Sequence, residues 1–335
     1  MADLPRGKTV LVCLLLAAAL LPAAGPAGAQ TLKIMMGSSL SPPSLDSITP
    51  YVAIAQGLFR KYGLDVEMVE FRGDATHTKA LLAGEVDVSG VMGPLNAIVA
   101  ASKGARIRLW MVPQPVSAYH FVARREAGAT LQALVGRNVA VSGIGAVSYH
   151  ISRIVLERSG VDPDRLQYVA VGSPADRFKA LVAGKIDATV VTDTEFVKLE
   201  KYPDIVSLAQ VSKVVPEIPY EFATAREEYL ERNPETMVRL TKALIEANRW
   251  IAANRAGTIA IAVKVIREES PEVLGKAYDV ADPRLYGVNG DITEAAYKYT
   301  TDLLLKVGYM KDPVPLDRFF DRRFVDRALK DLGRM

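Results

Sequence analysis

The stretch Ala80-Leu81-Leu82-Ala83-Gly84-Glu85-Val86-Asp87 recurs, with the same spacing, as Ala180-Leu181-Val182-Ala183-Gly184-Lys185-Ile186-Asp187. In both copies an apolar helical pattern ends at a glycine, which commonly terminates helices. A β-rich run with a conspicuous aspartate then follows. Eight residues can match by chance, but a match in the same local context is better explained by two equivalent structural units. The repeat therefore predicts two similar lobes.

Around the repeat, β-rich runs alternate with helical stretches. Strands are predicted at 31–37, 64–71, 86–91, 107–112, 138–142, 166–171 and 188–192, with helices at 50–62, 76–83, 95–101, 147–159 and 175–183. This alternation predicts an α/β fold with right-handed crossovers and mostly parallel sheets. The final third is predicted to be almost entirely helical, at 234–254, 258–269, 271–279, 293–307 and 316–332. We expect these helices to pack on the outside of one lobe.

Composition excludes several classes of protein. The 335 residues carry 41 basic and 38 acidic side chains, a net charge of +3, and half of them are hydrophobic. A disordered chain would be less apolar, and a nucleic-acid-binding protein would be expected to show a basic excess. The single cysteine, Cys13, excludes a disulfide framework.

Residues 1–29 have the order of a secretory signal peptide. Arg6 and Lys8 precede the apolar run 9–21, and the small-residue triplet 27–29 follows. The run is shorter than the roughly 20 residues that a membrane-spanning helix needs, so cleavage after Ala29 is favoured over an anchor. Cys13 lies inside the apolar run, which argues against a lipoprotein. We expect an exported, periplasmic protein without stable membrane insertion.

Several stretches resemble a known family. The stretch 51–67, YVAIAQGLFRKYGLDVE, is similar to a pattern of the taurine/nitrate/thiamine-precursor (NMT1/THI5-like, SsuA-like) periplasmic solute-binding proteins. The repeat at 80–87, the stretch 134–142 and Gly160-Val-Asp-Pro163 resemble further family patterns in the same order.

The resemblance implies a two-lobe periplasmic binding protein fold of type II. Lobe 1 would comprise 30–118 plus 223–335, and lobe 2 residues 119–222, with two hinge crossings between them. It also implies a monomer that closes on a small-molecule ligand and delivers it to an inner-membrane permease and its ATPase.

In open α/β sheets, ligands bind beyond the carboxyl ends of strands, near helix N-termini. Three loops in the first lobe and two in the second fit this rule, and two tyrosines lie near the expected crossings. The candidate residues are Ser38, Ser39, Gly73, Thr76, Gly93, Asn96, Gly145, Ala146, Val147, Ser148, Asp193, Tyr119 and Tyr220. Each also has a structural interpretation: a serine-rich turn for the first pair, helix capping for Asp74 or Thr76 and for Thr192 or Asp193, and hinge packing for the tyrosines.

Two ligand classes stay open. The stretch Ser142–Ser148, with two glycines between a strand and a helix, resembles an anion cradle, and with Ser38, Ser39 and Arg72 it favours a sulfonate or carboxylate. Asp193 and Glu195 would instead favour a pyrimidine or another heterocycle with donor groups.

Enzyme and metal functions find no support in the sequence. His77, His120 and His150 lack metal-ligand spacing, and no nucleophile elbow, phosphate-binding loop or complete dinucleotide motif is present. We therefore expect no cofactor and no catalysis. A periplasmic sensor that docks on a receptor kinase, and an enzyme of unrecognised type, are the alternatives from other classes.

Overall fold

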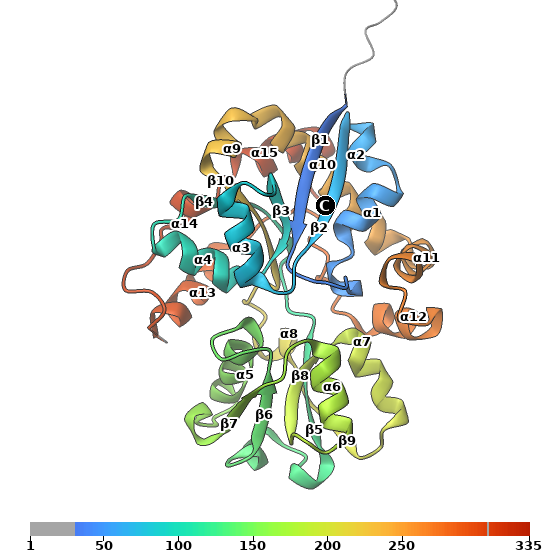
Figure 1. Cartoon of the computed structure of the whole chain (residues 1–335), viewed down its shortest axis with the longest axis vertical. Coiled ribbons are helices and arrows are strands. Elements are labelled where there is room, and N and C mark those ends of the chain that lie inside the picture. The colour runs from blue at the N-terminus through green and yellow to red at the C-terminus, as the bar shows by residue number, and fades with distance from the viewer. Residues whose placement is uncertain (1–30, 307) are drawn as a thin grey trace, which may run out of the picture. The chain divides into compact units, whose positions relative to one another are not determined.

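The computed structural model describes residues 31–306 and 308–335. The predicted signal peptide and its cleavage point lie outside the described residues, as does Val307 at the end of one predicted helix. Figure 1 shows two β-sheets, each flanked by helices. Within the described ranges, no helix combines the length and the hydrophobicity that crossing a bilayer requires.

The first sheet contains strands from both halves of the chain. Its order is β2 (Leu64–Glu70), β1 (Leu32–Ser38), β3 (Val88–Met92), β10 (Glu221–Arg226), β4 (Ile107–Gln114). β1 pairs in parallel with β2 and β3, whereas β10 is antiparallel to both of its neighbours.

The second sheet repeats this plan. Its order is β7 (Gln167–Ala170), β6 (Asn138–Val141), β8 (Ala188–Thr192), β5 (Tyr119–Arg124), β9 (Ile205–Gln210). Here β5 is the reversed strand, antiparallel to β8 and β9. Both sheets are therefore mixed, because each receives one strand directly from a crossing between the sheets rather than through a helical crossover.

Helices cover both sheets. Those before β5 are α1 (Thr49–Ala55), α2 (Leu58–Lys61), α3 (Asp74–Ala83) and α4 (Pro94–Ser102). The second sheet carries α5 (Val147–Arg158), α6 (Pro174–Val182), α7 (Asp193–Phe196) and α8 (Val211–Val214). The last third contains α9 (Glu227–Arg232), α10 (Pro234–Ala253), α11 (Arg255–Ile266), α12 (Pro271–Val280), α13 (Glu294–Lys306), α14 (Leu316–Phe319) and α15 (Arg323–Leu332). Short 3-10 helices include η1 (Leu45–Ser47) and η5 (Val197–Lys201).

The α/β prediction and the helical last third are confirmed, but two predicted helices are broken. The helix expected at 50–62 divides into α1 and α2, because Gly57 has a left-handed φ of 67°. The helix expected at 316–332 divides into α14 and α15. There Phe320 is extended and bridges to Leu109, so the main chain pairs with the sheet edge instead of continuing the helix.

The eight-residue repeat occupies equivalent places in the two sheets. The backbone N–H of Met35 in β1 donates to Asp87 over 2.8 Å, and that of Asn138 in β6 donates to Asp187 over 2.9 Å. Gly84 and Gly184 both have left-handed φ angles, 82° and 70°. Each aspartate therefore joins the start of its strand to the neighbouring strand, as expected for two equivalent units.

Candidate functional site

The chain passes twice between the sheets, from β4 to β5 and from α8 to β10. At the second crossing the N–H of Tyr220 donates to the carbonyl of Gln114 at the end of β4 over 2.9 Å. The rings of Tyr119 and Tyr220 meet edge to face, with centroids 5.2 Å apart. Both tyrosines are buried, so the structure brings together the two aromatic residues that the sequence placed at the crossings.

Four buried carboxyl groups lie close to these tyrosines or to one another; we call them the junction cluster. They are Asp46 of η1, Asp193 and Glu195 of α7, and Glu221 of β10, with exposures of 2%, 4%, 6% and 6%. Burial raises the pKa of all four, because a low-dielectric environment disfavours the charged form. The charge on Asp46 acts on Glu195, Glu221 and Tyr220, which places it at the centre of the cluster.

The four carboxyl groups differ in their partners. Asp193 contacts Nε2 of His120 at 2.7 Å, and Glu195 accepts a hydrogen bond from the Thr192 hydroxyl at 2.5 Å. Within residues 31–306 and 308–335, both oxygens of Asp46 and one oxygen of Glu221 lack a partner at full hydrogen-bond geometry, although the Tyr220 hydroxyl is close enough to Asp46 to oppose the rise of its pKa. Buried polar groups are almost always paired, so the unpaired oxygens mark a position where a bound molecule can complete the bonding.

A buried arginine near the cluster, Arg177, makes its hydrogen bonds within the second sheet and its helices. The guanidinium of Arg177, on α6, donates to the carbonyls of Gly172 and Val190, at 2.5 and 3.0 Å, and to the Thr189 hydroxyl. Burial lowers the pKa of Arg177, and the nearby Glu195 and two tyrosines oppose that effect. Arg177 thus joins α6 to β8 and adds a positive charge close to Tyr119 and Tyr220.

The predicted loops of the first sheet form a second, smaller polar group. Ser39 is hydrogen-bonded to Nδ1 of His77 at 2.9 Å, and the N–H of Gly73 donates to the Ser39 carbonyl. Ser38 is buried in the turn, and its hydroxyl accepts from the N–H of Leu40. Burial lowers the pKa of His77 to about 4, so its ring is neutral at pH 7.

Asp74 was expected to cap the helix that follows it, and this expectation is wrong. Its carboxylate instead accepts the N–H of Gly93 at 2.8 Å, which joins the starts of α3 and α4. A Cβ placed on Gly93 would come within 2.9 Å of Val147 at the start of α5. Gly93 therefore lies where the first-sheet loops meet the predicted cradle.

Thr76 and Asn96 lie apart from these contacts. Thr76 is exposed on α3, and Asn96 is half-buried in the first turn of α4.

The predicted anion cradle at Gly145–Ser148 is stabilised by hydrogen bonds among residues 142–150. The Ser148 hydroxyl lies 2.8 Å from both the N–H and the hydroxyl of Ser142, and the Gly145 carbonyl is 3.1 Å from Nε2 of His150. Gly145 has a left-handed φ of 83°, while Ala146 and Val147 are half-buried. Ser148 thus stabilises the start of α5 through its side chain.

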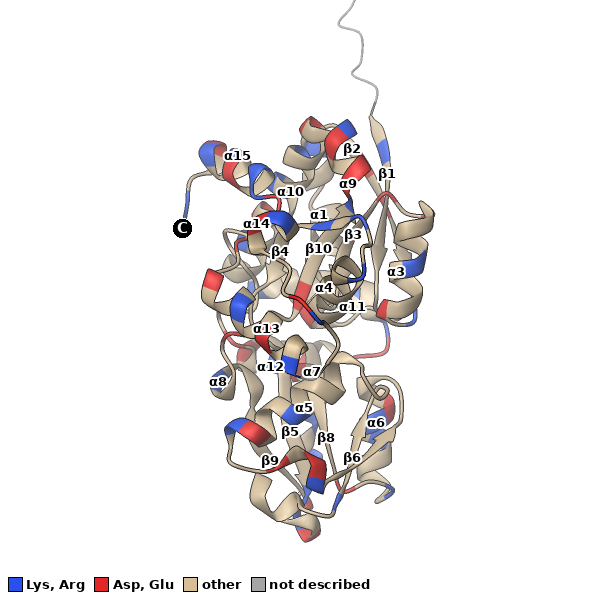
Figure 2. Ribbon diagram, turned by 90° about the vertical axis from the view of Figure 1, so that its left-hand side faces the viewer, with Lys and Arg blue, Asp and Glu red and all other residues tan. Residues whose placement is uncertain are grey.

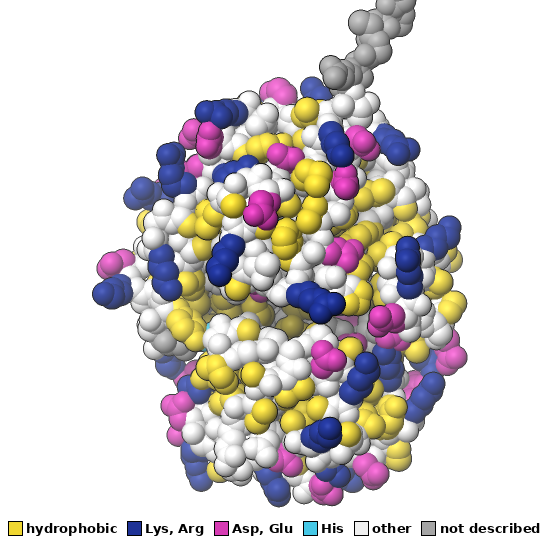
Figure 3. Space-filling model, viewed as in Figure 1, with side chains coloured by type: hydrophobic (Ala, Val, Ile, Leu, Met, Phe, Trp, Pro, Cys, Tyr) yellow, Lys and Arg dark blue, Asp and Glu magenta, His cyan; other side chains and the backbone are white. Residues whose placement is uncertain are grey.

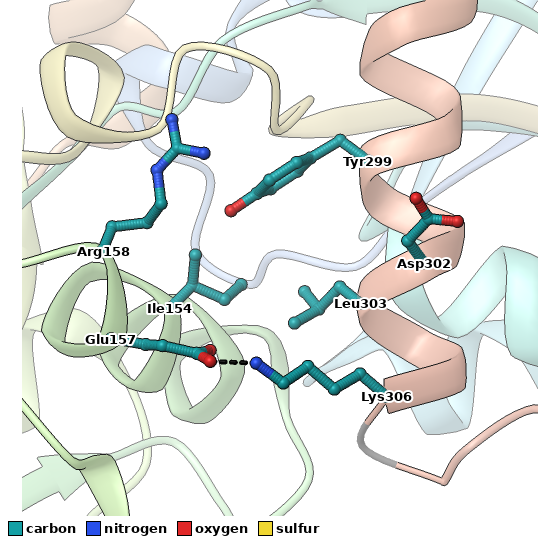
Figure 4. Close-up of a pocket in the computed structure, with 7 residues that line it drawn as sticks. All are labelled: Ile154, Glu157, Arg158, Tyr299, Asp302, Leu303 and Lys306. Atoms are coloured by element: carbon teal, nitrogen blue, oxygen red, sulfur yellow. Dashed lines mark hydrogen bonds and ion pairs between the residues drawn. The ribbon is translucent and has the colours of Figure 1, made fainter. Parts of the chain in front are cut away.

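A groove separates α5 from α13 (Figure 4). It has a volume of about 310 Å³ and is lined by Ile154, Glu157, Arg158, Tyr299, Asp302, Leu303 and Lys306. Lys306 pairs with Glu157 across it, and the Arg158 guanidinium lies 5.4 Å from the Tyr299 ring centre. The groove is lined by both acidic and basic side chains. We therefore interpret it as a contact between two helices and not as a binding site for a charged ligand.

Over the part of the chain that the structure describes, no three His, Cys, Asp or Glu side chains are grouped as metal ligands would be. On the face in Figure 3, positive and negative side chains are interspersed.

Two helix-flanked mixed sheets joined by crossings, with buried polar groups between them, define the fold of the periplasmic binding proteins. The family model described as NMT1/THI5 like matches residues 45–256, and the chain belongs to this family. The resemblance noted from the sequence motifs is thereby confirmed.

Individual relatives are distant. The putative binding protein YtlA of Bacillus subtilis is 22% identical over 292 residues, covering 84% of this chain and 86% of that protein. The formylaminopyrimidine-binding protein of Halalkalibacterium halodurans is 26% identical over 210 residues, covering 61% of this chain and 62% of that protein. The solved structure of the putative sulfonate ABC transporter's periplasmic sulfonate-binding protein SsuA from Methylobacillus flagellatus superposes with a TM-score of 0.73. It is 16% identical, and the match covers 90% of this chain and 96% of that one.

Sequence reasoning missed Asp46, Glu221 and Tyr286 as members of the junction. Asp46 lies in the segment after β1, and Glu221 directly follows Tyr220. Their positions in the sequence, next to predicted site residues, were a weak indication that they belong to the site. Tyr286, whose hydroxyl donates to the Leu45 carbonyl at 2.8 Å, follows α12 and carried none.

Proposed function

We propose that this protein is the solute-binding component of an ABC importer, which captures a small organic ligand between its two lobes. The observation that carries the proposal is the junction cluster, where oxygens of Asp46 and Glu221 that lack full hydrogen-bond partners within the described residues are buried beside the second crossing. Membership of the NMT1/THI5-like family supports it, as do relatives that are named as binding proteins.

In this proposal, lobe 1 comprises 30–118 plus 223–335 and lobe 2 comprises 119–222. The two crossings act as a hinge, and ligand contacts made by both lobes favour the closed arrangement. The inner-membrane permease would bind the closed form and receive the ligand, with its ATPase driving transport. The ligand leaves unchanged, since capture and release need no covalent step.

Export is part of the proposal. We expect the chain to be delivered to the periplasm and cleaved after Ala29, so that the mature protein begins at Gln30. The intact mass of protein recovered from the periplasm tests this expectation.

Ligand capture is tested by thermal unfolding of the exported protein with sulfonates, carboxylates, nitrate and pyrimidines. A ligand at 100 times its Kd should stabilise the protein by about 2.7 kcal/mol. Small-angle scattering with the same ligand should show a decrease in the radius of gyration. Extraction of the purified protein, followed by mass spectrometry of the supernatant, identifies any molecule carried from the cell.

The alternatives predict different results. A sensor would bind the ligand equally well but would support no uptake when combined with the permease in vesicles. An enzyme would convert the ligand during incubation. If neither the panel nor the extract yields a ligand, capture itself is wrong.

A further inference from the structure

The solvent-facing sides of α3 and α6 carry nearly the same residues. Both helices run into the eight-residue repeat, so that Gly84 corresponds to Gly184. The exposed positions are 75, 76, 79, 82 and 83 in the first lobe, and 176, 179, 182 and 183 in the second, where 175 is half-buried. We call these two sets of five positions the outer faces. They contain Ala, Thr, Lys, Leu and Ala in α3, and Ala, Asp, Lys, Val and Ala in and directly after α6.

Packing against the two sheets does not account for this match. Inward-facing positions of the same helices differ, since buried His77 corresponds to buried Arg177 and half-buried Thr78 to buried Phe178. Exposed positions usually contribute little to stability and are therefore free to differ. Residues that match at exposed positions, beside buried positions that do not, indicate a surface role that the two lobes share.

Each outer face combines apolar contact area with a positive charge. Leu82 and Val182 are 42% and 38% exposed, among the few large hydrophobic side chains that are exposed in the described ranges. Lys79 and Lys179 lie nearly one helical turn before them, and the lysine ion pairs of the described residues are formed by other lysines. Side chains spaced in this way along one helix face fit a groove on a partner, and the lysines complement acidic residues there.

The two outer faces belong to helices on the same side of the molecule. The sheets have equivalent strand orders, and α3 follows β2 as α6 follows β7. Both helices lie toward the viewer in Figure 1 and at the right-hand edge of Figure 2. Two equivalent surfaces on one side fit a partner that itself offers two equivalent surfaces, as a two-fold symmetric dimer does.

We propose that the outer faces of α3 and α6 dock on the permease, and that the permease is a two-fold symmetric dimer. Each permease subunit receives one of the two helices in an apolar groove with acidic residues at its rim. This inference rests on the proposed function and names the surface that the membrane partner recognises. Hinge closure changes the separation of the two helices, so both grooves are filled together in only one arrangement of the lobes. The permease distinguishes that arrangement from the others by this double contact.

Photochemical crosslinking in the cells that produce the protein tests the docking. Benzoylphenylalanine replaces Leu82 or Val182 in the full chain, and the adducts formed on irradiation are identified by mass spectrometry. Both positions should capture the same integral membrane protein. The control position is Lys330, exposed on α15, a helix on the opposite side in Figure 2, and it should not capture that protein.

Charge reversal tests the role of the lysines. Lys79→Glu and Lys179→Glu should each lower the yield of both adducts by up to about fivefold, the range for exposed ion pairs. The two decreases should be similar, because the partner subunits are identical. Lys330→Glu is the matched control and should leave the yields unchanged. All three variants should keep the wild-type Tm, because the side chains are exposed.

The docking assignment and the proposed function fail in different measurements. Adducts with two different membrane proteins, adducts with a second copy of this chain, or no membrane protein at either position overturn the docking assignment. Yields that the lysine variants do not change overturn the charged contact. Each of these results leaves solute capture intact. Solute capture fails only when the ligand panel and the extract from the purified protein are both negative.

Discussion

The ring of His77 shows how closely the first sheet packs around a polar side chain. His77 is fully buried, stacks on Phe71 with centroids 5.0 Å apart and bonds to Ser39. On its other side lies Gly37 of β1, where a Cβ would be 2.1 Å from Nε2 of the ring. The glycine in this strand is therefore required by the space that the imidazole occupies.

Gly37→Ala should destabilise the protein by about 1–3 kcal/mol, the usual cost of overpacking a core. The measurement is urea unfolding followed by circular dichroism. Gly143→Ala is the control, because a Cβ there meets no atom of the described residues within 4 Å, and we expect a change within about 0.5 kcal/mol. An unchanged urea midpoint for Gly37→Ala would show that His77 has room to move.

His150 makes stability depend on pH. Burial lowers its pKa from 6.5 to about 4, so the folded protein binds a proton less readily than the unfolded chain. The stability that comes from the neutral ring is complete above pH 6.5 and is lost as the pH falls toward 4. At one histidine this loss is on the order of 3 kcal/mol.

His150→Gln should remove this dependence while keeping a donor for the Gly145 carbonyl. The free energy of unfolding is measured for both proteins between pH 4 and 7, and the difference between the curves isolates His150. The junction acids, whose raised pKa values act in the opposite direction, are common to both proteins and cancel. Parallel curves would contradict the buried neutral imidazole.

At the scale of elements, the repeated aspartates join strands in the same way in both sheets. Asp87 accepts from Met35, and Asp187 accepts from Asn138. Asp187→Ala should cost about 1.5–3 kcal/mol, the range for hydrogen bonds to charged groups, and Asp87→Ala should cost a similar amount. Urea unfolding, with hydrogen exchange of the Asn138 amide, is the measurement.

The neighbouring positions of the repeat supply the control. Glu85 and Lys185 are exposed in the turns before the same strands, and their change to alanine should alter stability by no more than about 0.5 kcal/mol. If the aspartate variants behave like these controls, the strand-joining role is wrong.

At the scale of the whole molecule, helices that follow the second crossing contact elements of the second sheet. α12 lies beside α7, as Figures 1 and 2 both show. There Lys276 of α12 pairs with Glu200 at 2.5 Å. At a separate place, Tyr309, beyond α13, meets the His150 ring edge to face at 4.7 Å. If the lobes move apart as in the proposed hinge motion, these contacts are lost, so in that proposal they favour the closed arrangement.

Glu157→Lys should place like charges beside Lys306 and shift the lobes apart. The pair is exposed, so the expected loss of ligand affinity is only up to about fivefold. The radius of gyration should increase in the ligand-free protein. The double variant Glu157→Lys with Lys306→Glu should restore both values, and failure of this rescue would show that the pair has no part in closure.

Much of this architecture could be predicted from the amino-acid sequence. The repeated unit, the alternating strands and the motifs at 51–67 predicted two α/β lobes and the family, and both are confirmed. These features are local: helical spacing, glycine at helix ends and β-rich runs depend on near neighbours in sequence. Local sequence patterns did not predict the broken helices at Gly57 and Phe320 or the reversed strands β5 and β10. These features depend on contacts between residues that are far apart in the sequence.

The candidate site divides in the same way. The sequence by itself determined which loops follow strand ends and placed Tyr119 and Tyr220 at the crossings. The tertiary structure alone decided that Asp46, Asp193, Glu195 and Glu221 share one buried junction, because they come from three elements far apart in the chain. Burial and mutual proximity set the charge of a site, and both arise only when the two sheets are brought together.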